Sequence, residues 1–418
     1  MREPASGRLP AVGILFLART VYAFNWYNIG ALATLLEPAF GIGTAEFGIV
    51  LGMFLLGAGI FQVPAGFAAI RWGNRTTSIV ALVVMGGFTL ASAFSPNWIV
   101  LAGLRFGAGA GAALFFAPAL GLVASYFPEG TRGPIIGLYN SGFSLGSGIG
   151  IIVGAIVGER FGWPWALAVG GIALLATAGF AAASLPRVRE SLPIRATKEL
   201  WRSVVPVLRS RRLWALALGT TGTWGAFYVA AQYFVAFAKV AHPSWSLALA
   251  AAVPTTMIFA EIFGGPVGGW LGERHVDMRR ILIYWGLASG ILIALVPWLG
   301  FAEVWPAFVF LGFADGVIFA VLYLIPSYLP ELQGGRFVFG LAVLNSIQIF
   351  AGSGIAIAFG FVAAAFGYDA AWVFAGVLAV FVLPVVILVG GVSAAGRAAP
   401  AASASAPGLK QAELVRPG

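Results

Sequence analysis

The chain has 418 residues, of which 60% are apolar and only 9% are charged, and its mean hydropathy is +0.95. A soluble globular domain carries about 25% charged residues, so this composition excludes a water-soluble chain and indicates an integral membrane protein. The net charge of +9 would suit a nucleic-acid partner, but we expect none, because the cations follow the two sides of a membrane as described below.

Apolar runs of about 20 residues, separated by short stretches with charged residues, Pro or Gly, recur along the whole chain. Runs of this length cross a bilayer as α-helices, whereas a β-barrel would show alternation with a period of two residues. The runs fall at residues 10–36, 45–70, 76–95, 97–126, 134–158, 163–185, 213–239, 247–271, 280–300, 304–329, 337–364 and 370–394. We therefore predict an all-α integral membrane fold with twelve transmembrane helices in two pseudo-symmetric six-helix bundles.

A hydrophilic stretch that is rich in cations divides these runs into six and six. The composition predicts four segments: an N-terminal six-helix bundle at 1–185, a cytoplasmic linker at 186–212, a C-terminal six-helix bundle at 213–395 and a disordered cytoplasmic tail at 396–418. The tail is rich in Ala, Ser and Pro and has too little apolar variety to pack.

Short motifs recur in the two halves, in the same order and at nearly the same separation. They are Ser-Tyr-x-Pro-Glu at 125–129 and 327–331, Asn-Ser at 140–141 and 345–346, and Phe-Gly followed by an aromatic residue at 161–163 and 366–368. Many secondary transporters form a site at the middle of the membrane from repeated halves of this kind.

The positive charges predict the orientation of the chain. Of the 24 Lys and Arg residues, only Arg160 and Lys239 lie near one side of the membrane, and only Arg19 and Arg105 lie inside spans. The others lie in the loops and tails of the opposite side, which by the positive-inside rule is the cytoplasmic side. We expect a multi-pass protein of the cell inner membrane with both termini in the cytoplasm.

The residues available for chemistry exclude several classes of protein. Cysteine is absent, and the two histidines, His242 and His275, lie in predicted loops, so an imidazole or thiolate metal centre has too few ligands. The chain also lacks the Gly-x-x-x-x-Gly-Lys-[Ser/Thr] loop of ATP-driven pumps. We expect no enzyme activity, no cofactor and no metal.

Four ionisable residues lie well inside predicted spans: Arg19, Arg105, Glu261 and Asp315. A charge in the bilayer core costs at least about 2.5–3.5 kcal/mol, so such residues are functional candidates. An arginine binds carboxylates through two hydrogen bonds, which favours an anionic substrate at Arg19, and a desolvated acid such as Glu261 or Asp315 suits proton transfer. For Arg105 a structural or coupling role is favoured over substrate contact.

Polar and aromatic side chains share helical faces with these charges. Tyr22 and Trp26 follow Arg19 at a spacing of three to four residues, and Trp224, Tyr228 and Gln232 repeat the pattern in the seventh span. The candidate substrate-binding or coupling residues are Arg19, Tyr22, Asn25, Arg105, Tyr139, Asn140, Tyr228, Gln232, Glu261, Asp315, Tyr323, Asn345 and Gln348.

Three segments carry a resemblance to a known family. The loop at 66–75 (GFAAIRWGNR) resembles the G-x-L-a-D-R-x-G-r-[KR] signature of the major facilitator superfamily, with Ile70 in place of the acid. The fourth span matches the superfamily pattern around Arg105, with Ala108 in place of a glutamine. The fifth span has the glycine spacing of the superfamily's antiporters, but Ile151 stands where they have proline.

The resemblance implies a secondary active transporter that works by alternating access. In that architecture spans 1, 4, 7 and 10 line the cavity, spans 3, 6, 9 and 12 face lipid, and the signature loops form a cytoplasmic gate of Gly66, Arg71, Gly73, Arg75, Gly269, Glu273 and Arg274. We expect a small organic solute as substrate, an anion being favoured, with a proton as coupling ion, the lipid bilayer as surroundings and a monomeric chain. The alternative is a proton-driven efflux antiporter for drugs or metabolites, against which Ile151 argues.

Overall fold

The computed structural model describes residues 8–126, 129–186, 205–274, 277–332 and 336–392. The first half contains α1 (Arg8–Tyr27), η2 (Gly30–Leu32), α2 (Ala33–Phe40), α3 (Thr44–Trp72), α4 (Asn74–Ser92), α5 (Trp98–Tyr126), α6 (Glu129–Phe161) and α7 (Trp163–Ser184). The second half contains α9 (Arg211–Ala241), α10 (Leu247–Glu273), α11 (Met278–Leu295), η3 (Val296–Trp298), α12 (Phe301–Leu324), η4 (Ile325–Tyr328), η5 (Pro330–Leu332), α13 (Arg336–Val382) and η6 (Leu383–Val389). The described residues are helices and turns without a strand. Most of the predicted linker and the whole predicted tail lie outside the described residues.

Nine helical stretches in the described part of the chain are long and apolar enough to cross a membrane. One of them, Phe339–Val389, contains two crossings, because Gly367 adopts a non-helical conformation (φ 86°, ψ 166°) inside α13. These stretches therefore make ten crossings, and α1 and α9 make two more. The predicted all-α fold of twelve transmembrane helices is confirmed.

The crossings of α1 and α9 are less apolar than the others because protein surrounds them. Nearly every residue of α9 from Leu213 to Ala238 is buried, including its threonines, tyrosines and Gln232. A helix that is covered by neighbouring helices needs no apolar surface toward lipid, so it tolerates polar side chains. These two helices are the first of each half.

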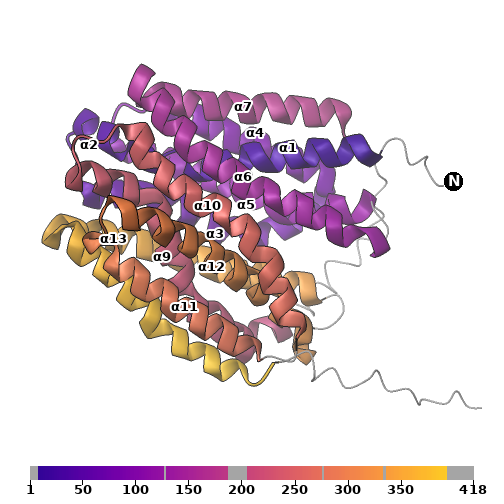
Figure 1. The fold of residues 1–418 in the computed structure, drawn as a ribbon. Coiled ribbons are helices and arrows are strands. Elements are labelled where there is room, and N and C mark those ends of the chain that lie inside the picture. Colours follow the sequence, from indigo (N-terminus) through magenta and orange to yellow (C-terminus); the bar gives the residue numbers. More distant parts are fainter. Residues whose placement is uncertain (1–7, 127–128, 187–204, 275–276, 333–335, 393–418) are drawn as a thin grey trace, which may run out of the picture.

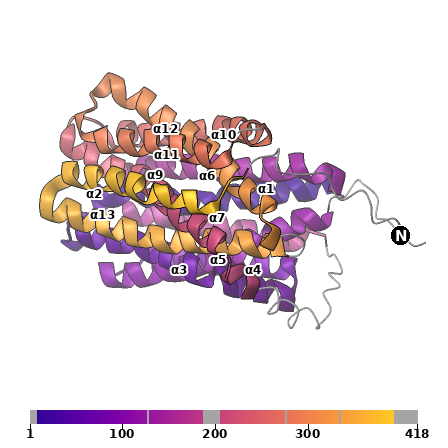
Figure 2. The same ribbon diagram turned by 90° about the horizontal axis from the view of Figure 1, so that it is seen from below.

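Each half of the chain forms one bundle. In the first, α1 packs against α6 and α7, α3 against α5, and α4 against α5 and α7; in the second, α10 packs against α12, and α9 and α11 against α13. Figures 1 and 2 show the purple and the orange-yellow halves lying side by side. Contacts of α3 with α13 and of α6 with α10 join the two bundles.

The helices run between two ends of the molecule (Figure 1). The near face is the end with Arg8, Trp72 and Arg211, where α1 and α9 begin and α3 ends. The far face is the end with Phe40 and Phe161, where α2 and α6 end.

Large apolar side chains are exposed along the helices that were expected to face lipid. Examples are Phe88 on α4, Phe180 on α7, Ile291 on α11 and Phe381 on the last part of α13. A water-exposed protein would not leave so much apolar surface uncovered, whereas a bilayer covers it.

The first crossing is broken, although the sequence indicated one continuous run at 10–36. Helix α1 ends at Tyr27 and the chain continues through η2 into α2. The Asn25 side chain donates to the carbonyl of Val21 (2.9 Å) and competes with regular helix bonding. Gly30 lies against α9 so closely that a Cβ there would come within 2.7 Å of the Gln232 Cα, which requires glycine.

Candidate functional site

Arg19 is the centre of a cage of aromatic rings. Its guanidinium carbon lies 4.5 Å from the ring centroid of Phe143, 5.0 Å from Tyr22, 5.1 Å from Phe116 and 5.3 Å from Tyr139. Ring faces attract a cation, and these four come from α1, α5 and α6.

The Arg19 guanidinium is buried and incompletely bonded. Only 5% of the residue is exposed, yet its Nε and Nη1 atoms have no hydrogen-bond partner, and neither does the Tyr139 hydroxyl. Leaving buried donors unsatisfied is costly, and most so for a charged group. Ligand atoms that accept two hydrogen bonds, as a carboxylate does, would satisfy this site.

The acids of the second half lie on the other side of the bundle interface. Ser144 Oγ on α6 donates to Glu261 Oε2 on α10 over 3.2 Å, and Arg19 acts electrostatically on the same carboxyl. Asp315 on α12 is within electrostatic range of Glu261. Three of the four predicted intramembrane charges are therefore grouped around the interface between the bundles.

Polar side chains of the second half extend this group. Tyr323 donates to Asn345 Oδ1 (2.8 Å) and lies within electrostatic range of Arg19 and Asp315. Gln348 Nε2 donates to Thr220 Oγ1 (2.8 Å), and both line a small pocket beside Asp315 that also contains Trp224 and Phe319.

Aromatic residues from both bundles meet next to this group. Tyr228 stacks on Trp224, with ring centroids 5.8 Å apart and planes at 8°, and lies 5.6 Å from the ring of Tyr27. Phe143 contacts Trp26 and Tyr27 at 5.9 and 6.2 Å. The aromatic wall thus crosses from α1 and α6 to α9.

Other predicted site residues make contacts that join helices. Asn25 donates to the Gly170 carbonyl of α7 (3.2 Å), so it joins two helices of the first bundle. Arg105 is fully buried in that bundle, with its guanidinium carbon 4.4 Å from the Phe54 ring and a long hydrogen bond (3.5 Å) to the Asn25 carbonyl. Gln232 donates to the Trp26 carbonyl (2.9 Å) and connects the bundles at the break after α1. Asn140 is exposed on α6.

The predicted gate residues lie at the near face. Arg75 binds the carbonyls of Leu185 (3.0 Å) and Ala182 (2.6 Å) at the end of α7, while Arg71 is exposed. Gly73 has a positive φ of 81°, which explains the glycine of the motif. In the equivalent loop of the second half, which starts at Gly269, Val276 stands at the position of Gly73 and lies outside the described residues. In the second half, the Arg274 guanidinium carbon lies 3.9 Å from the Trp270 ring centroid, and Glu273 is exposed. A Cβ at Gly66 in the first half or at Gly269 in the second would meet no atom within 4 Å.

Several hydrogen bonds between the described parts of the two bundles lie from the middle of the molecule toward the far face. Ser346 donates to the Gly59 carbonyl (2.7 Å) and Ser353 to the Gly52 carbonyl (2.9 Å), which joins α13 to α3. On the other side the Leu247 amide donates to Glu159 Oε1 (3.2 Å), which joins α10 to α6. The far face is therefore closed.

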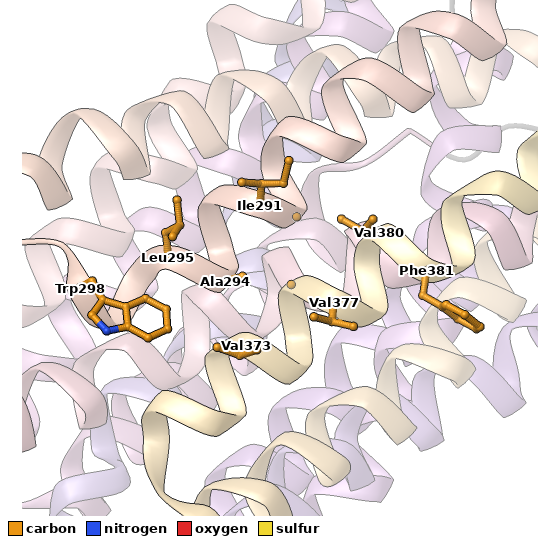
Figure 3. A pocket seen from close by; sticks show the side chains of 10 residues that line it. Ile291, Ala294, Leu295, Trp298, Val373, Val377, Val380 and Phe381 are labelled. Carbon is orange, nitrogen blue, oxygen red and sulfur yellow. The ribbon is translucent and has the colours of Figure 1, made fainter.

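The apolar groove in Figure 3 is a different feature. Ile291, Leu295 and Trp298 form one wall, and Val373, Val377 and Phe381 of α13 form the other. The groove opens on the side where apolar side chains are exposed, and its lining contains no charged side chain that would fix a polar solute. It is not part of the Arg19 site.

Sequence reasoning missed Phe143, Phe116, Ser144 and Tyr27. The spacing of Tyr139 and Phe143 places both on one face of α6, a signal that was available. Nothing in the sequence distinguished Ser144 from the other small residues of that helix.

A sequence model of the Major Facilitator Superfamily matches residues 15–347. The 4-hydroxybenzoate transporter PcaK of Pseudomonas putida is 25% identical over 303 residues, which are 65% of this chain and 68% of that protein. The match to PcaK of Pseudomonas aeruginosa spans 65% of its length. The D-galactonate transporter of Escherichia coli O6:H1 is 25% identical over 94% of this chain and 98% of its own length.

Solved structures share the fold. A bacterial homologue of the lysosomal transporter Spinster, in an inward-facing and occupied conformation, superposes with a TM-score of 0.73 at 17% identity, over 92% of this chain and 97% of that chain. The inward-open xylose transporter XylE from E. coli gives a TM-score of 0.72 at 12% identity with the same coverage.

Proposed function

The chain belongs to the major facilitator superfamily, and we propose that it moves a small organic carboxylate across the membrane by alternating access with proton coupling. The observation that carries the proposal is the buried Arg19 guanidinium, which has two unpartnered nitrogens inside a ring of aromatic side chains. The carboxylate takes these two donors, and the aromatic wall accepts the rest of the substrate.

The relatives support this class of substrate. Two of them are transporters named for 4-hydroxybenzoate and D-galactonate, and others are named for gallate and for hexuronate. These are carboxylates of different shapes, and the four rings around Arg19 favour the flat aromatic acids among them. Drug efflux fits less well, because an apolar or cationic compound would leave the guanidinium unpaired.

The acids of the second bundle provide the proton site in this proposal. Glu261 lies in the field of Arg19, so a neutral Glu261 leaves that cation free for the substrate carboxylate, whereas an ionised Glu261 competes for it. Proton and anion then bind together, which is the condition for symport. Asp315 adds a second carboxyl within electrostatic range of Glu261.

The closed far face supports an inward-facing state. The near face carries the cation-rich loops, and we propose that it lies in the cytoplasm, with both termini on that side of the inner membrane. Opening would then require the bundles to separate at the far face and close at the near face.

The proposal is tested by measuring thermal stabilisation of the purified full chain by benzoates, sugar acids and their methyl esters. Free acids that bind at Arg19 should raise the melting temperature, and the matched esters, which lack the charge, should not. Uptake of the best acid into proteoliposomes should then follow an imposed inward proton gradient. Equal stabilisation by acids and esters would exclude the anion site.

A further inference from the structure

A carboxyl that the proposed mechanism does not use lies at the far face. Glu37 belongs to α2, the short helix that follows the break after α1, and it comes directly after the apolar run at 10–36. Its side chain is half-buried, and its Oε1 atom is buried without a hydrogen-bond partner. Among the described residues no cation forms an ion pair with it.

The two bundles meet at this helix. Helix α2 comes from the first bundle and packs against α9 of the second as well as against α3. Tyr233 of α9 is fully buried there and donates to the Ala356 carbonyl of α13 (2.9 Å), and a Cβ at Gly48 of α3 would lie 3.2 Å from that carbonyl. Part of the surroundings of Glu37 is therefore supplied by the second bundle across the closed far face.

Within the described part of the chain, the titratable groups that interact electrostatically with Glu37 are one carboxyl and two phenols. Glu46 on α3 repels its charge, and the phenols of Tyr233 on α9 and Tyr368 on α13 lie within electrostatic range. Burial, followed by the Glu46 charge, raises the pKa of Glu37 from 4.5 to about 7. An acid in this setting is more stable in its protonated form than it would be in water.

We propose that Glu37 binds a proton when the two bundles close the far face and releases it when they separate. It is a proton site apart from Glu261 and Asp315, and it senses the solution on the far side of the membrane. The inference does not require that the chain carries any particular substrate, because it concerns the balance between two conformations.

The direction of the pH effect follows from linkage. When the bundles separate, water reaches the carboxyl and its pKa returns toward 4.5. Between about pH 4.5 and pH 7 the closed state holds a proton that the open state has lost, so lowering the pH across this window favours closure. Above about pH 7 neither state holds the proton, and below about pH 4.5 both do, so the effect levels off at each end.

The absence of native cysteine allows a direct test. Phe161→Cys on α6 and Val240→Cys on α9 place exposed labelling sites at the far ends of the two bundles. Spin labels at these sites report the distance across the far face by double electron-electron resonance, in the full chain in lipid nanodiscs between pH 4.5 and pH 8. The short-distance population should grow as the pH falls, by at most about tenfold per pH unit relative to the open population.

Variants separate Glu37 from the central acids. Glu37→Gln, which keeps the shape of the side chain, should make the populations much less dependent on pH. Glu46→Gln should keep the response but move its midpoint to lower pH, and this variant leaves Glu37 itself unchanged. Glu303→Gln, an exposed acid in the first turn of α12, is the matched control.

Two results would overturn the inference. One is a pH response in Glu37→Gln equal to that of the unaltered chain, which would assign the titration to other acids. The other is a response whose midpoint stays in place in Glu46→Gln. A failure of substrate binding at Arg19 would affect neither measurement.

Discussion

At the scale of single residues, Arg19 is the most informative side chain. It carries a permanent charge, it is 5% exposed, and it has rings instead of an acid as its nearest neighbours. A structural arginine in a membrane interior is normally paired, because an unpaired ion costs several kcal/mol. The missing partner is the reason to place the substrate here.

Arg19→Gln should weaken binding of the best carboxylate by about 10- to 100-fold, since a hydrogen bond to a charged group contributes about 1.5–3 kcal/mol. The affinity of Arg19→Lys should lie between those of the unaltered protein and Arg19→Gln, because lysine keeps the charge but not the paired donors. Calorimetric titration of the detergent-purified protein measures both variants. Arg280→Gln, an exposed arginine in the first turn of α11, should bind like the unaltered protein, and an unchanged affinity in Arg19→Gln would refute the assignment.

Glu261→Gln should uncouple transport from the proton gradient. A permanently neutral side chain leaves Arg19 available at every pH, so substrate exchange across the membrane should continue while accumulation driven by a pH gradient is lost. Counterflow and gradient-driven uptake in proteoliposomes distinguish the two activities. Ser144→Ala, which removes the hydrogen bond to Glu261, should shift the pH profile of uptake without abolishing it. Accumulation that persists in Glu261→Gln would move the proton site to Asp315.

At the scale of helices, the two halves share one unusual turn. Gly162 (φ 89°, ψ 158°) precedes α7, and Gly367 (φ 86°, ψ 166°) interrupts α13 at the corresponding place in the second half. This region of backbone conformation is essentially restricted to glycine. The repeated Phe-Gly-aromatic motif therefore encodes the turn between the last two crossings of each bundle.

Gly162→Ala and Gly367→Ala should each destabilise the protein by about 1–3 kcal/mol through backbone strain. Space is not the cause, because a Cβ at Gly367 would meet no atom within 4 Å and one at Gly162 would make only an ordinary contact. Gly179→Ala and Gly354→Ala are the controls, since both glycines are exposed within helices and alanine there should be neutral or stabilising by about 0.5–1 kcal/mol. Unfolding by SDS in mixed micelles measures the free energy of unfolding of each variant. An equal loss of stability at all four positions would contradict the strain argument.

At the scale of the whole molecule, alternating access requires the contacts at the far face to break. Glu159 on α6 and Leu247 on α10 are hydrogen-bonded across the bundle interface there. Cysteines at both positions, joined by a short bis-methanethiosulfonate, should reduce uptake more than about tenfold, because most transport cycles need that interface to open. A reducing agent should restore the uptake.

A matched pair within one bundle controls for the chemistry. Phe40 and Trp163 both belong to the first half and have ring centroids 5.2 Å apart. Cysteines at these positions, cross-linked in the same way, should leave transport intact because the bundle moves as a unit. Inhibition by both cross-links alike would show that rigid movement of the bundles is the wrong description.

Much of this architecture was predictable from the sequence. The length and composition of the apolar runs require helices, since every backbone group in lipid needs an internal partner. The motif repeat related the halves, and the charges marked Arg19, Glu261 and Asp315 because ions are rare in a membrane interior. The spacing of Tyr22 and Trp26 after Arg19 placed them on one helical face.

Other features depended on tertiary structure. Periodicity assigns a residue to a helical face, but it does not say which neighbour that face meets. The hydrogen bonds of Asn25 and Gln232, which connect α1 to α7 and to α9, were therefore not predictable. The break after Tyr27 depends on the approach of α9 to Gly30, a contact between distant parts of the chain. Glu37 directly follows the first apolar run, and this position in the sequence gave no sign that the second bundle would partly bury its side chain.

The sequence by itself therefore determined the membrane location, the twelve crossings and the inventory of buried charges, because these follow from local composition and the solvent properties of lipid. Only the tertiary structure decided which charges meet, which remain unpaired, and which face is closed. Those outcomes depend on how two bundles of similar composition are rotated and pressed against each other, and that arrangement results from contacts between residues hundreds of positions apart, such as Ser346 with Gly59.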